Sequence, residues 1–151
     1  MVLRTLGRDA ISMKTPAAAV QIKANGDFRI NDKNTEGPGE YDVAGVGVHI
    51  YNGYLVLFTE GVRIAVLWDP TAKIDAEDET NIDAFVFFTS DVKQINTVIK
   101  EQDPRLAVFT DEAIANEVTQ LDGVSLSRES NYKVTAATLP VEDRQFVALV
   151  S

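Results

Sequence analysis

The sequence predicts a β-rich α+β fold built in layers, and three observations carry that prediction. Short runs of alternating or wholly apolar residues recur along the chain, about ten in all, with turn-forming residues between them. Two further segments repeat their apolar residues at helical spacing. The strand-like runs come first and the helical segments alternate with strands near the end, which is typical of layered α+β proteins. At 151 residues we expect one domain spanning 1–151.

Two Asn-Gly pairs predict the hairpins of the first half. Asn25-Gly26 separates Ala18–Lys23 from Phe28–Ile30, and Asn52-Gly53 precedes Tyr54–Thr59. This dipeptide is a strong hairpin signal because both residues tolerate a positive φ. Further strands are expected at Val2–Leu6, Val62–Leu67, Ala84–Thr89, Arg105–Phe109, Val124–Leu126, Tyr132–Thr135 and Gln145–Val150.

The segment Tyr41–Tyr51 predicts one long strand with two unlike faces. Alternation places Ala44, Val46, Val48 and Ile50 on an apolar face directed at the core. The other face would carry the more polar set, which comprises Tyr41, Val43, Gly45, Gly47, His49 and Tyr51. Because Gly leaves room for close approach, we expect this second face to be an exposed interface.

Two helices are expected in the second half. Asp91 and Gln94 fit a capping box, and the helix should end near Gln102, ahead of Pro104. Thr110 is the expected N-cap of the second helix. Gly123 supplies a typical C-terminal stop for that helix.

Composition excludes several classes of site and partner. The chain has no Cys, which excludes disulfides, thiolate zinc sites and Cys nucleophiles. It has one His. Its formal charge of −9 argues against nucleic acid and anionic membranes as partners, because both are polyanions. The N-terminal residues lack the apolar core of a signal peptide, and no apolar run reaches the ~20 residues of a membrane span. We expect a cytoplasmic protein.

Four stretches resemble the metallo-β-lactamase-fold hydrolases. They are LGRDAISMK at 6–14, GPGEYDVAGV at 37–46, VRIAVLWD at 62–69 and KVTAATLP at 133–140. The second is close to a signature of one GPGEY-containing branch of that superfamily. The resemblance implies an αββα fold, in which two sheets form a sandwich with flanking helices and the chemistry lies at one edge. The present chain would be a shortened form.

The same resemblance implies that the metal site of the family is missing. Two metal ions are held there by an HxHxDH loop, two further His and an Asp, but the corresponding segment Ala24–Gly37 contains no His. Arg8 stands in place of the first His of the family. Asp69 matches the bridging Asp, preceded by Trp68 in place of Gly. We therefore expect no metal and no other cofactor.

Individual residues leave alternatives open. His49 is either a ligand or general base, or a strand residue on a polar face, and Asp69 is either a catalytic remnant or a strand end. The remaining candidates for binding residues are Arg8, Trp68, Tyr41 and Tyr51. The acidic run at 75–79 either binds a hard cation or is a solvated loop.

Three hypotheses follow. The first is a catalytically inactive metallo-β-lactamase-like protein that acts by binding or assembly, as a homo-oligomer, because lost segments expose sheet surface that a second copy would cover. The second is a hydrolase with a remodelled or inter-subunit site that uses Asp69 and His49. The third is an unrelated β-rich domain that contains GPGEY by chance. The sequence does not identify a small-molecule ligand.

Overall fold

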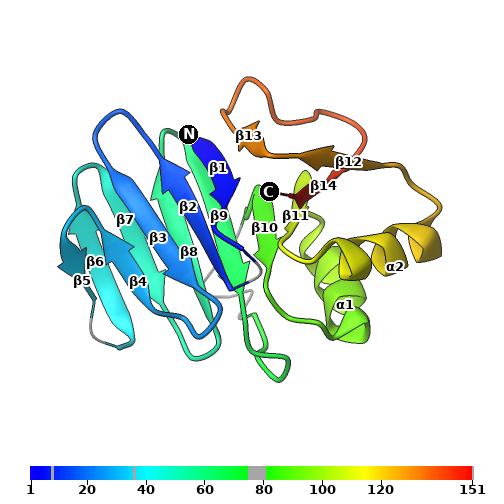
Figure 1. The fold of residues 1–151 in the computed structure, drawn as a ribbon, viewed down its shortest axis with the longest axis horizontal. Helices are drawn as coiled ribbons and strands as arrows, with labels where there is room; N and C mark the ends of the chain where they lie inside the picture. Colours follow the sequence, from blue (N-terminus) through cyan, green and yellow to red (C-terminus); the bar gives the residue numbers. More distant parts are fainter. Residues whose placement is uncertain (8, 36, 75–80, 151) are drawn as a thin grey trace.

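Apolar and polar residues alternate along the N-terminal part of the chain, and this part folds into an antiparallel sheet with one exposed face. The computed structural model describes residues 1–7, 9–35, 37–74 and 81–150. The smaller sheet has the strand order β13-β1-β2-β3-β4-β5 (Figure 1). Its strands are β1 (Val2–Thr5), β2 (Ala10–Lys14), β3 (Ala19–Lys23), β4 (Phe28–Ile30), β5 (Lys33–Asn34) and β13 (Asn131–Lys133).

The larger sheet is mixed, with the order β12-β14-β11-β10-β9-β8-β7-β6. Neighbouring strands from β6 through β9 pair antiparallel. From β9 to the other edge, in the order β9-β10-β11-β14-β12, neighbouring strands pair parallel. The parallel strands β10 and β11 are wholly apolar because both of their faces are buried. The strands are β6 (Gly39–Val43), β7 (Val46–Ile50), β8 (Tyr54–Thr59), β9 (Val62–Leu67), β10 (Ala84–Phe87), β11 (Leu106–Phe109), β12 (Leu126–Glu129) and β14 (Gln145–Leu149).

Helices α1 (Val92–Gln102) and α2 (Glu112–Asp122) form where helical periodicity predicts them. The Asp91 carboxylate accepts from the Gln94 amide at 3.1 Å, and Gly123 ends α2 with φ +65°. The N-cap of α2 is Asp111, so the prediction of Thr110 is wrong. The reason is that Thr110 is buried and its hydroxyl donates to the Phe87 carbonyl. Neither described helix is long and apolar enough to cross a membrane.

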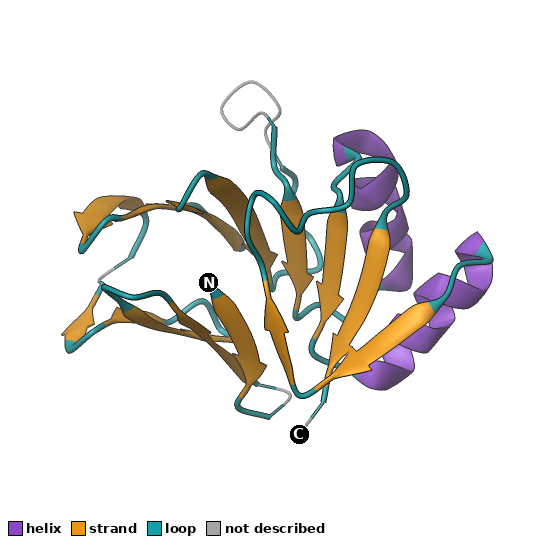
Figure 2. Cartoon of the chain, turned by 90° about the horizontal axis from the view of Figure 1, so that it is seen from above, coloured by secondary structure: helices purple, strands orange, loops and turns teal. Residues whose placement is uncertain are grey.

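Two apolar cores separate three layers. One core lies between the sheets, and the other lies between the larger sheet and the helices. Figure 2 shows both helices over the same outer face of the larger sheet, toward its parallel end. The flanking helices that the resemblance implies are present, and the described ones cover this outer face. The outer face of the smaller sheet carries exposed polar residues such as Arg4, Lys14 and Lys23.

The segment 41–51 is a hairpin, which corrects the expectation of one strand. Ala44 and Gly45 form its turn with φ +52° and +79°. Val46, Val48 and Ile50 are buried, as predicted, but Ala44 is exposed in the turn, so its placement on the core face is wrong. Because residues opposite each other in an antiparallel pair share a face, the pairing of Tyr41 with Val48 places Tyr41 on the inner face. Tyr41 thus lies on the opposite side of the sheet from His49.

Both Asn-Gly hairpins are present, but only Gly26 and Gly53 of these pairs have a positive φ, each +91°. Two positive φ values in succession occur instead at Ala44-Gly45 and Glu60-Gly61.

The Ala44 turn is testable through stability. Ala44→Gly should raise the free energy of unfolding by roughly 0.5–1 kcal/mol, because the left-handed conformation strains alanine and not glycine. As a control, Ala19→Gly in the exposed part of β3 should lower it by a similar amount. Urea denaturation measures both, and a destabilising Ala44→Gly would contradict the turn geometry.

Candidate functional site

The carboxyl end of β9 lies against the β3–β4 turn of the other sheet. A Cβ atom at Gly26 would be 2.5 Å from Cζ2 and 2.7 Å from Cε2 of Trp68, so only glycine permits this approach. The indole packs against the inter-sheet core, and the Trp68 amide donates to the Gly53 carbonyl at 3.1 Å. Trp68 therefore holds the two sheets together at this edge.

Asp69, the next residue, uses its carboxylate within its own turn. Oδ1 accepts from the amide of Thr71 at 2.8 Å and from the Thr71 hydroxyl at 2.7 Å. The backbone hydrogen bond, followed by the hydroxyl, lowers the pKa of Asp69 below its ordinary value. The Gln94 side chain donates to the carbonyls of Asp69 and Ala72 at 2.8 and 3.1 Å. These two hydrogen bonds connect α1 to the loop after β9.

His49 lies on the outer face of β7, where it forms an aromatic and polar cluster. Its Nδ1 is 2.6 Å from the Tyr51 hydroxyl and 3.7 Å from a Glu40 carboxylate oxygen. The ring centroids of His49 and Tyr51 are 3.9 Å apart, and Tyr51 stacks on Tyr54 at 4.6 Å. This arrangement can hold a proton between His49 and Tyr51 at the surface of the sheet.

Beside this cluster the sheet surface is hollowed. The hollow measures about 680 Å³ and its lining includes Glu40, Asp42, His49, Phe58 and Arg63. The Phe58 ring is 51% exposed, with the Arg63 guanidinium 5.4 Å from its centroid. We call the outward surface formed by Glu40, Asp42, Gly47, His49, Phe58 and Arg63 the β6–β9 face.

The candidate residues predicted from the sequence fall into separate places. His49 on the β6–β9 face contacts the neighbouring Tyr51, whereas Trp68 and Asp69 lie at the end of β9. The register aligns His49 with Val56 and Val56 with Ala65, four residues before Asp69. At the ordinary strand rise, His49 and Asp69 are thus about 13 Å apart along the strand direction alone. Arg8 and the acidic run at 75–79 lie outside the described residues.

Sequence reasoning missed Glu40, Phe58 and Arg63 as members of one surface. Phe58 breaks the otherwise buried pattern of β8, but its exposure follows from the position of the helices, which the sequence does not show. The register of the folded sheet brings this surface together: Asp42 lies opposite Gly47, and Gly47 lies opposite Phe58.

Comparison with known proteins bears on the fold. No family model matches the chain, and no curated protein matches it. Among solved structures, it is similar to a Thermotoga maritima protein assigned as a Zn-dependent hydrolase of the metallo-β-lactamase superfamily. The two share 13% sequence identity with a TM-score of 0.69, over 99% of each chain. The chain has a metallo-β-lactamase-like fold.

A metallo-β-lactamase-like fold implies a metal site, and the residues described here do not fit one. Within residues 1–7, 9–35, 37–74 and 81–150, no group of three His, Cys, Asp or Glu is arranged to hold a metal ion. Zinc takes imidazole, thiolate or carboxylate ligands. The sole His is hydrogen-bonded to Tyr51, and the Asp69 carboxylate accepts a hydrogen bond from the Thr71 amide. We derive no metal-dependent step.

The close approach of Trp68 is testable at Gly26. Gly26→Ala should lower the free energy of unfolding by about 2–4 kcal/mol, because backbone strain and an atomic clash with the indole add. Gly7→Ala is the matched control, with φ +108° and open space around its Cβ, and should cost about 1–2 kcal/mol. In a Trp68→Ala background the two substitutions should become equal in urea denaturation. An unchanged difference there would show that the indole does not cause the clash.

The turn at Asp69 gives a pH-dependent prediction. A carboxylate whose pKa is lowered in the folded state stabilises the protein above its unfolded pKa of about 3.9, and this stability is lost as pH falls through the folded pKa. Asp69→Asn keeps the acceptor oxygen and loses the charge. The wild-type protein should therefore have a higher melting temperature than Asp69→Asn at pH 7. This difference in melting temperature should disappear below about pH 4.

Two controls accompany that comparison. Asp143→Asn, at an exposed position outside the β6–β9 face, controls for net charge. Thr71→Val should make the melting temperature less dependent on pH, because it removes one donor to the Asp69 carboxylate. A gap between wild type and Asp69→Asn that stays constant from pH 7 to pH 2 would contradict the role of the charge.

Proposed function

We propose that this protein is a shortened relative of the GPGEY-containing branch of metallo-β-lactamase-fold hydrolases that acts by binding or assembly instead of zinc-dependent hydrolysis. The packing of Trp68 against Gly26 is the observation that carries the proposal. The resemblance aligns Asp69 with the metal-bridging Asp of the family, and at that position an indole takes up the space beside the strand end. The Asp69 carboxylate is already bonded to Thr71.

A second copy of the chain is the proposed partner, and the β6–β9 face is the proposed contact surface. This face belongs to the same side of the larger sheet as the helices, but lies at its antiparallel end (Figure 2). Phe58 places a half-exposed ring there, and exposed apolar surface with a polar rim commonly marks an interface. Glu40, Asp42 and Arg63 supply that rim.

The remodelled-hydrolase alternative has one observation in its favour, the 2.6 Å contact between His49 and the Tyr51 hydroxyl. Such a pair can move a proton in general acid–base catalysis. This alternative expects turnover of generic phosphodiester, lactone or thioester substrates that is lost in both His49→Gln and Asp69→Ala. Turnover in either variant at the wild-type rate would count against it.

Two measurements test the proposal. Protein purified without chelator should contain far less than one zinc per chain, and light scattering should show oligomers at micromolar concentration. Phe58→Ser should weaken this self-association by roughly tenfold, as expected for an aromatic anchor. Val141→Ser is the control, because Val141 is 91% exposed and lies far along the chain from the β6–β9 face. Stoichiometric zinc would overturn the loss of the metal site, and a monomer at all concentrations would overturn assembly.

A further inference from the structure

The charge of the chain is divided sharply between its layers. Residues 1–34, which contain strands β1 to β5, hold six basic and three acidic residues, a formal charge of +3. The remaining residues hold eight basic and twenty acidic residues, a formal charge of −12. The net charge of −9 therefore conceals a positive sheet attached to a strongly negative remainder.

The positive charges share one surface of the smaller sheet. Arg4 pairs with Ser12, Ser12 with Gln21, and Gln21 with Arg29, so the two arginines lie in one row on one face. In the next row, Val2 is paired with Lys133 on one side and with Lys14 on the other, so these two lysines share a face. Lys23 is paired with Ala10. All of these cations are exposed; they are Arg4, Lys14, Lys23, Arg29 and Lys133.

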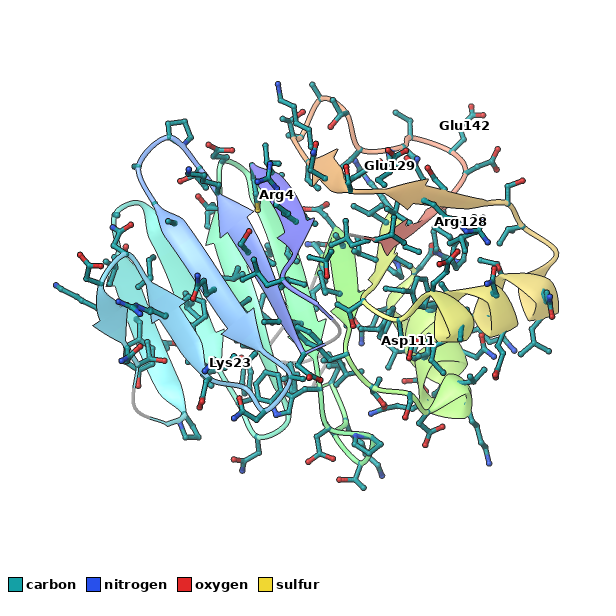
Figure 3. The ribbon with its side chains drawn as sticks, viewed as in Figure 1. Arg4, Lys23, Asp111, Arg128, Glu129 and Glu142 are labelled. Carbon is teal, nitrogen blue, oxygen red and sulfur yellow. The ribbon has the colours of Figure 1, made fainter. Side chains whose placement is uncertain are left out.

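We call this surface the cationic face. The strands that form it contain no Asp or Glu. Figure 3 is viewed with the smaller sheet in front and labels Arg4 on β1 and Lys23 on β3. Arg29 also has Asp32 at 3.6 Å, but both side chains are largely exposed, so this pair is weak.

The surroundings of these cations favour a protein partner over nucleic acid. The outward positions between them are small or amide side chains, including Ser12, Gln21 and Ala10, and no aromatic ring is among the outward residues of these strands. Faces that bind single strands generally combine cations with aromatic rings on which bases stack. A long polyanion would also run onto the −12 remainder of the molecule. A compact acidic surface with the footprint of the sheet avoids both problems.

The β6–β9 face of the same chain carries two carboxylates suited to this contact, beside the single guanidinium of Arg63. Glu40 and Asp42 lie two residues apart on the edge strand β6, on the outer side of the larger sheet. The Glu40 side chain is 81% exposed. Carboxylates about 7 Å apart along a strand match the spacing of neighbouring rows on the cationic face, which are also two residues apart.

We propose that copies of this chain assemble head to tail, with the cationic face of one copy seated on the β6–β9 face of the next. The cations of Arg4 and Lys14 meet the carboxylates of Glu40 and Asp42 of the neighbour. The proposal rests on the self-association argued above and names the second surface. Because the two surfaces differ, the contact is heterologous and leads to rings or filaments instead of a closed two-fold dimer.

A two-fold contact through the β6 edges is disfavoured by the same residues. Antiparallel pairing of β6 with its copy about Tyr41 would bring Glu40 opposite Asp42 of the neighbour, and like charges directly opposite destabilise a strand pair. Charged residues on an edge strand are a common means of preventing this pairing.

Paired charge variants of the full chain test the proposal by sedimentation velocity. Arg4→Gln with Lys14→Gln should weaken self-association roughly tenfold, and Glu40→Gln with Asp42→Asn should do the same. The matched controls lie on exposed helix positions and change charge equally: Lys93→Gln with Lys100→Gln, and Glu101→Gln with Glu117→Gln. These should change association by less than about twofold. Raising NaCl from 50 to 500 mM should weaken the wild-type assembly.

Mixing the two defective proteins is the decisive step. Each retains one intact surface, so an equimolar mixture should form one-to-one pairs that grow no further. If wild type assembles but the variants match their controls and mixing recovers nothing, head-to-tail contact is overturned while assembly through another surface stands. If wild type stays monomeric throughout, the proposed assembly falls as well. If monomeric wild type instead binds a 30-nucleotide single-stranded DNA and only Arg4→Gln with Lys14→Gln loses it, the cationic face serves nucleic acid and the inference is overturned.

Discussion

Burial of the larger sheet on both faces is the constraint on which the rest of the structure depends. Its inner face is covered by the smaller sheet along its length, through one continuous apolar core. Its outer face needs a second cover, and α1 and α2 supply it with Ile95, Val98, Ile99, Ala115 and Val118. Two helices cover the parallel end and leave β6 to β9 with less protection (Figure 2). The exposed ring of Phe58 follows directly from this shortage of helices.

The edge of the sandwich at the end of β9 is used for packing. Trp68, Gly26 and Gly53 bring the end of β9 close to two turns, and Asp69 stabilises the loop that follows. A reactive edge requires polar groups that remain open to substrate and solvent. In this chain the same positions contribute packing and hydrogen bonds.

Local signals in the sequence account for most of the elements but for little of the surface. Both helices, the strands β8 to β11, β14 and the two Asn-Gly hairpins follow from periodicity and turn residues. The predictions for the other two strands are misplaced: β12 (Leu126–Glu129) shares only Leu126 with the predicted Val124–Leu126, and β13 (Asn131–Lys133) shares only its last two residues with the predicted Tyr132–Thr135. The Ala44-Gly45 turn has little local signal, because alanine carries no turn preference, so alternation alone predicts one strand over β6 and β7. Asp111 replaced Thr110 as N-cap because burial of Thr110 is decided by tertiary packing. The contact of Trp68 with Gly26 joins residues far apart in sequence and has no local signature.

Trp68 is the only tryptophan of the chain, and it sits where the two sheets meet. Its fluorescence therefore reports on a single physical event, the separation of the smaller sheet from the larger one at this edge. Excitation at the red edge of the indole absorption band avoids the four tyrosines of the chain, so this signal follows the docking of the two sheets at the end of β9.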